Sequence, residues 1–70
     1  MTRYYIIYIP TSKILYTLTN KPKVYHSTSF ARDSINWICA LDVSRNWLNY
    51  NDIKFPAINE EFEIVEVTND

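Results

Sequence analysis

The seven-residue run RYYIIYI, residues 3–9, constrains the fold more than any other stretch, because six of its residues are apolar or aromatic. Tyr and Ile are enriched in strands, and Pro10 follows directly, so the run predicts a β-strand. Successive strand residues point to opposite faces, which makes both faces of this strand apolar. We therefore expect it to be a central strand that is covered on both sides.

Three other segments carry strand-forming patterns. Residues 14–19, ILYTLT, predict the return strand of a hairpin, and residues 24–27, VYHS, predict a short extended segment. Residues 60–67, EEFEIVEV, predict the last strand, in which glutamates are interspersed with apolar residues. Charged side chains are typical of edge strands, where they discourage unwanted pairing, so we expect this strand at an edge of the sheet.

A helix is predicted between the short extended segment and the last strand. Ser27, Thr28 and Ser29 are consecutive N-cap candidates, and Asp33 follows early enough to favour the positive end of the helix dipole. On a helical wheel the apolar side chains span a stripe of about 160°. The stripe consists of Phe30, Ala31, Ile35, Trp37, Ile38 and Leu41. Asp42 would fall within the same stripe, so the helix should break or bend near that residue.

The order of these elements predicts the fold class. Val43, Trp47 and Tyr50 have the spacing of a short second helical turn. The order is therefore β-β-(β)-α-β, and we predict an α+β fold with a small antiparallel sheet of three to four strands and one main amphipathic helix packed on one face. The first strand should lie between its hairpin partner and the last strand. Residues 1–70 are interpreted as a single domain, because a chain of this length supports one core.

This fold leaves open how the second face of the first strand is covered, since one helix covers only one face of so small a sheet. The two alternating sets of side chains are Tyr4, Ile6 and Tyr8 on one face, and Tyr5, Ile7 and Ile9 on the other. Segment 46–60, which contains several large apolar residues, is one candidate cover. The other is a second protomer or another protein, because a large exposed apolar patch normally marks an interface.

Residues that could carry catalysis are few and separated. Cys39 lies at the margin of the apolar stripe, and His26 lies before the N-cap, more than three helical turns of about 3.6 residues each away from Cys39, so neither activates the other. The glutamates of the last strand converge only in pairs, because neighbouring strand residues point to opposite faces. The chain has no glycine, which excludes the known phosphate-binding loops. We predict no enzymatic activity, no cofactor and no metal site.

Charge is divided unevenly along the chain. Residues 1–32 carry five basic residues and no acidic one, whereas residues 33–70 carry eight acidic residues and two basic ones. Either the two halves neutralise each other across the fold, or they form a dipolar surface that orients a charged partner. In the first half basic residues are interleaved with aromatic ones, as in proteins that bind single-stranded nucleic acid. That alternative rests on Arg3, Lys13, Lys21, Lys23 and Arg32, and the sequence pI of about 5.7 argues against it.

Protein–protein interaction is the function that the sequence favours. We expect a small module, either monomeric or a homodimer, that binds and modulates another protein as an accessory or inhibitory factor such as those in phage genomes. The candidate contacts are Tyr4, Tyr8, Tyr16, Tyr25 and an exposed Trp47, because Tyr and Trp combine a large contact area with a polar group. The apolar run near the N-terminus is too short for a signal peptide or a membrane span, so we expect no membrane partner and a cytoplasmic location, or the host cytoplasm if a phage encodes the chain.

Overall fold

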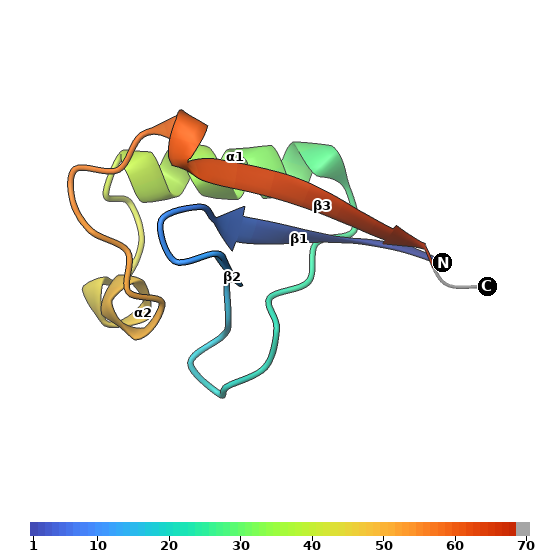
Figure 1. Cartoon of the computed structure of the whole chain (residues 1–70), viewed down its shortest axis with the longest axis horizontal. Helices are drawn as coiled ribbons and strands as arrows, with labels where there is room; N and C mark the ends of the chain where they lie inside the picture. Colours follow the sequence, from blue (N-terminus) through green and yellow to red (C-terminus); the bar gives the residue numbers. More distant parts are fainter. Residues whose placement is uncertain (69–70) are drawn as a thin grey trace.

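The computed structural model describes residues 1–68 and contains a three-stranded antiparallel sheet in the order β2-β1-β3, with the main helix α1 behind it in the view of Figure 1. The strands are β1 (Thr2–Tyr8), β2 (Lys13–Ile14) and β3 (Phe62–Thr68). β1 pairs antiparallel with both neighbours, which confirms the predicted α+β fold, its central strand and its acidic edge strand. The predicted domain, residues 1–70, extends over two residues that lie outside the described part.

The return strand of the hairpin is shorter than predicted. β2 covers only Lys13–Ile14, followed by one more backbone bond from Leu15 to Ile6, whereas the pattern of residues 14–19 predicts six strand residues. From Tyr16 onward the backbone no longer pairs with β1, because its N–H donates to Oδ1 of Asn51 over 2.7 Å. The chain then leaves the sheet in a turn around Asn20, whose φ is 64°.

The segment before the helix returns to β1 as an isolated bridge rather than a strand. Tyr25 and Tyr4 exchange two backbone hydrogen bonds of 2.9 Å. The Tyr25 ring is buried, and its hydroxyl shares a hydrogen bond of 2.7 Å with the buried hydroxyl of Ser34 on α1. This pair of contacts fixes the position of α1 over the sheet.

Helix α1 (Thr28–Cys39) begins and ends with recognisable caps. The hydroxyl oxygen of Ser27 accepts from the N–H of Phe30 over 3.2 Å. At the other end Leu41 has a φ of 58°, its N–H donates to the carbonyl of Ile38, and the next N–H, of Asp42, donates to the carbonyl of Trp37. This is the Schellman arrangement, in which glycine is the usual left-handed residue. The helix therefore ends close to the predicted break at Asp42.

The buried face of α1 is narrower than the apolar stripe predicts. Its buried residues are Ala31, Ser34, Ile35 and Ile38. Phe30, Trp37 and Leu41 were expected in the core, but they are 64%, 54% and 48% exposed. The sheet against which α1 packs is narrow, so it covers only the side of the helix that carries Ile35 and Ile38.

The short helix α2 (Arg45–Tyr50) and the segment that follows it pack on the same side of the sheet as α1. Leu48 and Ile53 are buried in one core with Ile6 and Tyr8 of β1. The N–H of Lys54 donates to the Tyr8 hydroxyl over 3.2 Å. The chain then passes through the single 3₁₀ turn η1 (Asn59–Glu61) into β3. Segment 46–60 therefore completes the first core and does not cover the second face of the sheet.

Candidate interaction surface

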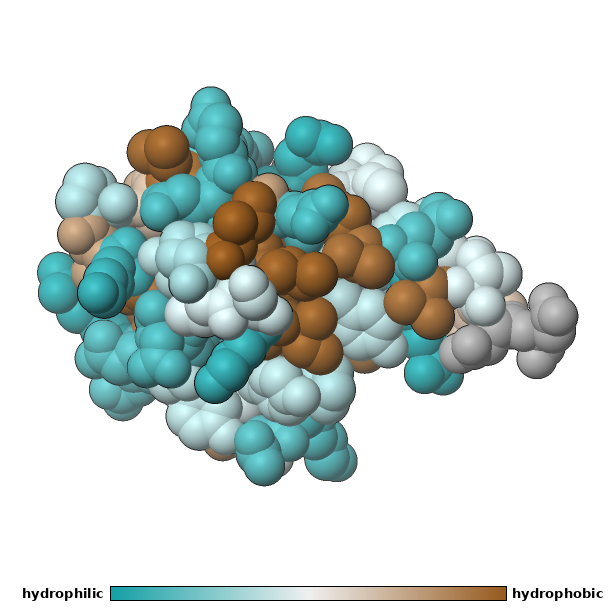
Figure 2. Space-filling model, viewed as in Figure 1, coloured by the Kyte–Doolittle hydropathy of each residue, from teal (hydrophilic) through white to brown (hydrophobic). Residues whose placement is uncertain are grey.

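The face of the sheet that points away from α1 is left uncovered, and it is the strongest candidate for a functional surface. We call it the open face; its members, on the three strands, are Arg3, Tyr5, Ile7, Ile14, Glu63, Val65 and Val67. Figure 2 shows hydrophobic side chains gathered in the middle of this side of the molecule, over β1 and β3. Tyr5, Ile7 and Val65 are half-buried, and Val67 is 38% exposed. A contiguous apolar surface of this kind is typical of interaction sites.

The register of the strands defines how this face is organised. Tyr5 lies opposite Val65, and Ile7 lies between Ile14 on one side and Glu63 on the other. Directly opposed residues of antiparallel strands point to the same face, so these side chains are neighbours. Ile9, just beyond β1, is 49% exposed. The alternating set Tyr5, Ile7 and Ile9 is therefore the uncovered one.

The aromatic residues predicted as contacts are distributed differently. Tyr8 is 2% exposed and Tyr25 is 8% exposed, so both rings belong to the core and offer little area to a partner. Tyr4 and Tyr16 are half-buried. Trp47 was expected to be exposed, but it is half-buried because its indole N–H donates to the carbonyl of Tyr16 over 2.7 Å. The structure does not gather these five residues on one surface.

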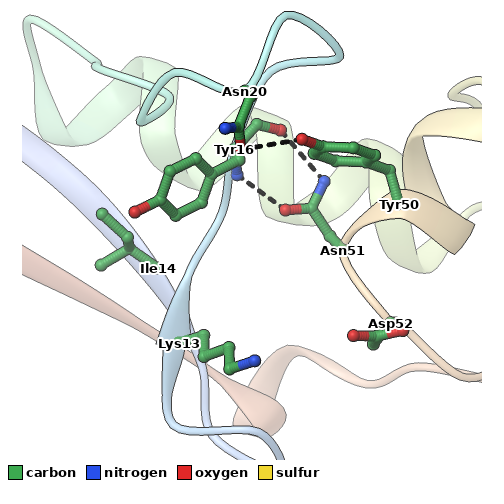
Figure 3. A pocket seen from close by; sticks show the side chains of 7 residues that line it. All are labelled: Lys13, Ile14, Tyr16, Asn20, Tyr50, Asn51 and Asp52. Atoms are coloured by element: carbon green, nitrogen blue, oxygen red, sulfur yellow. Dashed lines mark hydrogen bonds between the residues drawn. The ribbon is translucent and has the colours of Figure 1, made fainter.

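A hollow of about 550 Å³ lies between β2, with the chain that follows it, and the end of α2 (Figure 3). The side chain of Asn51 reaches across it and bonds to both backbone groups of Tyr16, and the Tyr50 hydroxyl donates to Oδ1 of Asn20 over 2.8 Å. These polar side chains are thus engaged with the protein itself. Their arrangement attaches α2 to the sheet, and we interpret the hollow as structural.

Another hollow, of about 350 Å³, lies beside α1 and is lined largely by apolar groups of Trp37, Val43 and Trp47. Phe30 on the same helix and Leu41, just after its C-terminal end, are also exposed. The apolar stripe predicts Phe30, Trp37 and Leu41 in the core, so this second apolar surface does not follow from the sequence pattern.

The only cysteine and the only histidine of the chain lie in different surroundings. Cys39 is half-buried near the end of α1, and burial raises the pKa of its thiol, with further contributions from the carboxylates of Glu61 and Glu60. A raised pKa keeps the sulfur protonated, which is the opposite of what a nucleophile needs. His26 is exposed in the segment before α1. Within residues 1–68, no three His, Cys, Asp or Glu side chains lie close enough together to hold a metal ion.

The basic residues considered for nucleic-acid binding do not form one track. Arg3 lies on the open face, whereas Arg32 is on α1, on the opposite side of the sheet. Lys23 is half-buried, with its ammonium 5.8 Å from the centre of the Tyr25 ring. Lys13 and Lys21 are exposed in and after β2. A single strand of nucleic acid would have to pass around the molecule to contact all five.

Two further findings bear on function. No helix in the described part of the chain combines the length and the apolar character needed to cross a membrane. Comparison of the chain with protein-family models, with curated proteins and with solved structures finds no match.

Proposed function

We propose that this protein is a small non-enzymatic interaction module and that the open face is its contact surface. The observation that carries the proposal is the row Tyr5, Ile7 and Val65 in the middle of a sheet whose other face carries the hydrophobic core. Exposing a continuous apolar sheet face is unfavourable in water, so its burial by a protein partner supplies a driving force for association. An accessory or inhibitory role toward another protein would use the same surface.

A second copy of the chain is the first partner that we propose. Arg3 and Glu63 stand at opposite ends of the open face, on neighbouring strands and about 13 Å apart along them. A twofold axis between two facing sheets can place Arg3 of one copy over Glu63 of the second copy, and the reverse, with the apolar row in between. The strands then cross at an angle close to the roughly 30° typical of stacked sheets. The face is thus complementary to itself in charge as well as in apolar character.

The test is the mass of the protein in solution, measured by light scattering with size exclusion over a concentration series. We expect a dimer that dissociates only on dilution. Val65→Lys places a charge in the middle of the open face and should give a monomer at all concentrations. Leu18→Lys is the matched control, because Leu18 is 56% exposed in the loop after β2. A wild-type chain that stays monomeric at every concentration would rule out the homodimer.

Binding of single-stranded nucleic acid is the second proposal, and one observation favours it. Arg3 and Tyr5 share the open face, and single-strand binders stack bases on sheet aromatics beside basic residues. Glu63 on the same face and the acidic strand β3 oppose it. Anisotropy of a labelled oligothymidylate at low salt tests this proposal, which predicts binding that weakens steeply with added salt and on Arg3→Ala.

A further inference from the structure

Strand β3 is an edge strand, and its outer side presents free pairing positions along the sheet. Tyr4 and Ile6 of β1 direct their backbone groups away from β3, since Tyr4 bonds to Tyr25 and the carbonyl of Ile6 accepts from Leu15. The alternate residues of β1 therefore bond to β3, and Tyr5 is paired with Val65. Opposed residues in an antiparallel pair exchange either both hydrogen bonds or neither.

It follows that the backbone of Ile64 and Glu66 points outward from β3. Each residue presents one N–H and one carbonyl, at the spacing that a further strand would need. Such an edge is the template used in β-strand addition, in which an extended peptide joins an existing sheet.

A groove runs between this edge and α1. It has a volume of about 310 Å³, and its apolar lining comes from Ile35 on α1 and from Phe62 and Ile64 on β3. At one end the side-chain amide of Asn59 donates to Oδ1 of Asn36 over 2.9 Å and ties η1 to α1. A strand added to β3 would direct every second side chain into this groove, because Ile64 points to the α1 side of the sheet.

The charge of the edge identifies the kind of segment that fits. Residues 60–66 carry four glutamates and no basic residue, and Arg32 of α1 is the only cation among the residues that line the groove. Pairing of β3 with β3 of a second copy would bring eight carboxylates together, which is unfavourable. An extended segment with basic residues opposite Glu63 and Glu66 instead forms favourable cross-strand pairs.

We propose that the outer edge of β3 binds an extended basic segment of another protein as a fourth, antiparallel strand. The register specifies its pattern: a basic residue opposite Glu66, any residue opposite Val65, an apolar residue opposite Ile64 and a second basic residue opposite Glu63. The apolar residue enters the groove beside Ile35. The backbone edge and the groove lie outside the open face, with which this site shares only Glu63, and strand addition does not require the homodimer.

The probe is a fluorescein-labelled peptide, Thr-Lys-Thr-Val-Lys-Thr, titrated with the full chain and followed by anisotropy at low salt. Methylation of the valine nitrogen removes the donor that faces Ile64, and we expect about tenfold weaker binding or a complete loss. Methylation of the central threonine nitrogen is the matched control, because that N–H points away from β3. A peptide with glutamate in place of both lysines should not bind.

Variants of the protein test the same register. Glu66→Lys should weaken binding of the peptide by about fivefold to tenfold. Asp42→Lys, an equal change in charge at an exposed site outside β3, should weaken it much less. Leu18→Lys, an added charge at an exposed site in the loop after β2, should weaken it no more than Asp42→Lys does. Failure of the parent peptide to bind, or equal effects of the two methylations, would show that no strand is added.

Discussion

The side-chain amide of Asn51 pairs with the backbone of Tyr16 as a neighbouring strand would. Its Oδ1 accepts from the N–H of Tyr16 over 2.7 Å, and its Nδ2 donates to the carbonyl over 3.0 Å. The same carbonyl also accepts from the indole N–H of Trp47. One side chain thus satisfies the backbone where β2 stops and holds α2 against the sheet.

Removal of this amide should therefore destabilise the whole fold. We expect Asn51→Ala to lower the free energy of unfolding by about 1–3 kcal/mol, because the half-buried N–H of Tyr16 loses its partner. Asn51→Asp keeps the acceptor but places a carboxylate oxygen against the carbonyls of Tyr16 and Trp47, so it should also destabilise the fold. Urea unfolding followed by tryptophan fluorescence measures these differences. Asn49→Ala, at an exposed position of the same helix, is the control, and an equal effect there would contradict the assignment.

The left-handed residue that ends α1 gives a prediction of opposite sign. Leu41 has a φ of 58°, a conformation that glycine adopts without the steric penalty of a side chain. Its side chain is 48% exposed, so little packing is lost on removal. We expect Leu41→Gly to stabilise the protein by about 1 kcal/mol after the greater freedom of glycine in the unfolded chain is included. Thermal unfolding measures the change.

Leu18 provides the comparison for this substitution. It is similarly exposed, but it is not among the residues with positive φ. Leu18→Gly should therefore be neutral or destabilising. If Leu41→Gly lowered the melting temperature as Leu18→Gly does, the left-handed turn would not be a source of strain.

Local patterns in the sequence predict the elements and their order well, because the strands and α1 depend on periodicity and on capping residues. The central position of β1 follows from its two apolar faces, and the end of α1 follows from Asp42. The absence of glycine predicts asparagine or aspartate at positive φ; Asn20 and Asp52 agree, but Ser12 and Leu41 do not. Tertiary contacts select those two positions, and they cannot be derived from local preference.

The sequence predicts the candidate surface less well, for a physical reason. Alternation defines the set Tyr5, Ile7 and Ile9 as one of two faces, but the choice between the faces depends on where α1 packs. That choice is made by tertiary contacts, such as the bond between Tyr25 and Ser34, nine residues apart, and the bond between Tyr8 and Lys54, 46 residues apart. The same contacts bury Tyr8 and Tyr25, two of the rings that composition alone suggests as partner contacts.

A charge-swap experiment tests the geometry proposed for the homodimer. Arg3→Glu and Glu63→Lys each place like charges opposite one another at both ends of a twofold interface. Either change should raise the dimer dissociation constant by about tenfold or more, and the double variant should restore it. Sedimentation equilibrium measures these constants, with Arg32→Glu as the control on the opposite side of the sheet. This pairing would be excluded if the double variant lost as much free energy of dimerisation as the two single variants lose together.

Stability should fall in alkaline solution because buried acidic groups of the fold are held in their neutral forms. Burial raises the pKa of the Cys39 thiol above its ordinary value of 9.0, and burial raises the pKa of Tyr25 above 10.0 although its bond to Ser34 partly offsets the shift. A group whose pKa is higher in the folded state contributes stability below its unfolded pKa and loses it as the pH rises through the folded value. The free energy of unfolding should therefore decrease above about pH 9.

Substitution of the thiol separates the two contributions. Cys39→Ala removes the earlier group, so the decrease should begin nearer to the unfolded pKa of tyrosine, 10.0, and the remaining decrease should follow the phenolate absorbance. Tyr25→Phe removes the group that ionises at higher pH, so stability should fall less steeply with pH in the alkaline range. The same substitution removes the hydroxyl partner of Ser34, which lowers stability at every pH. Urea unfolding at a series of pH values measures both profiles. Coincident profiles for Cys39→Ala and the unmodified chain would mean that the thiol is as easily ionised in the folded protein as in the unfolded one.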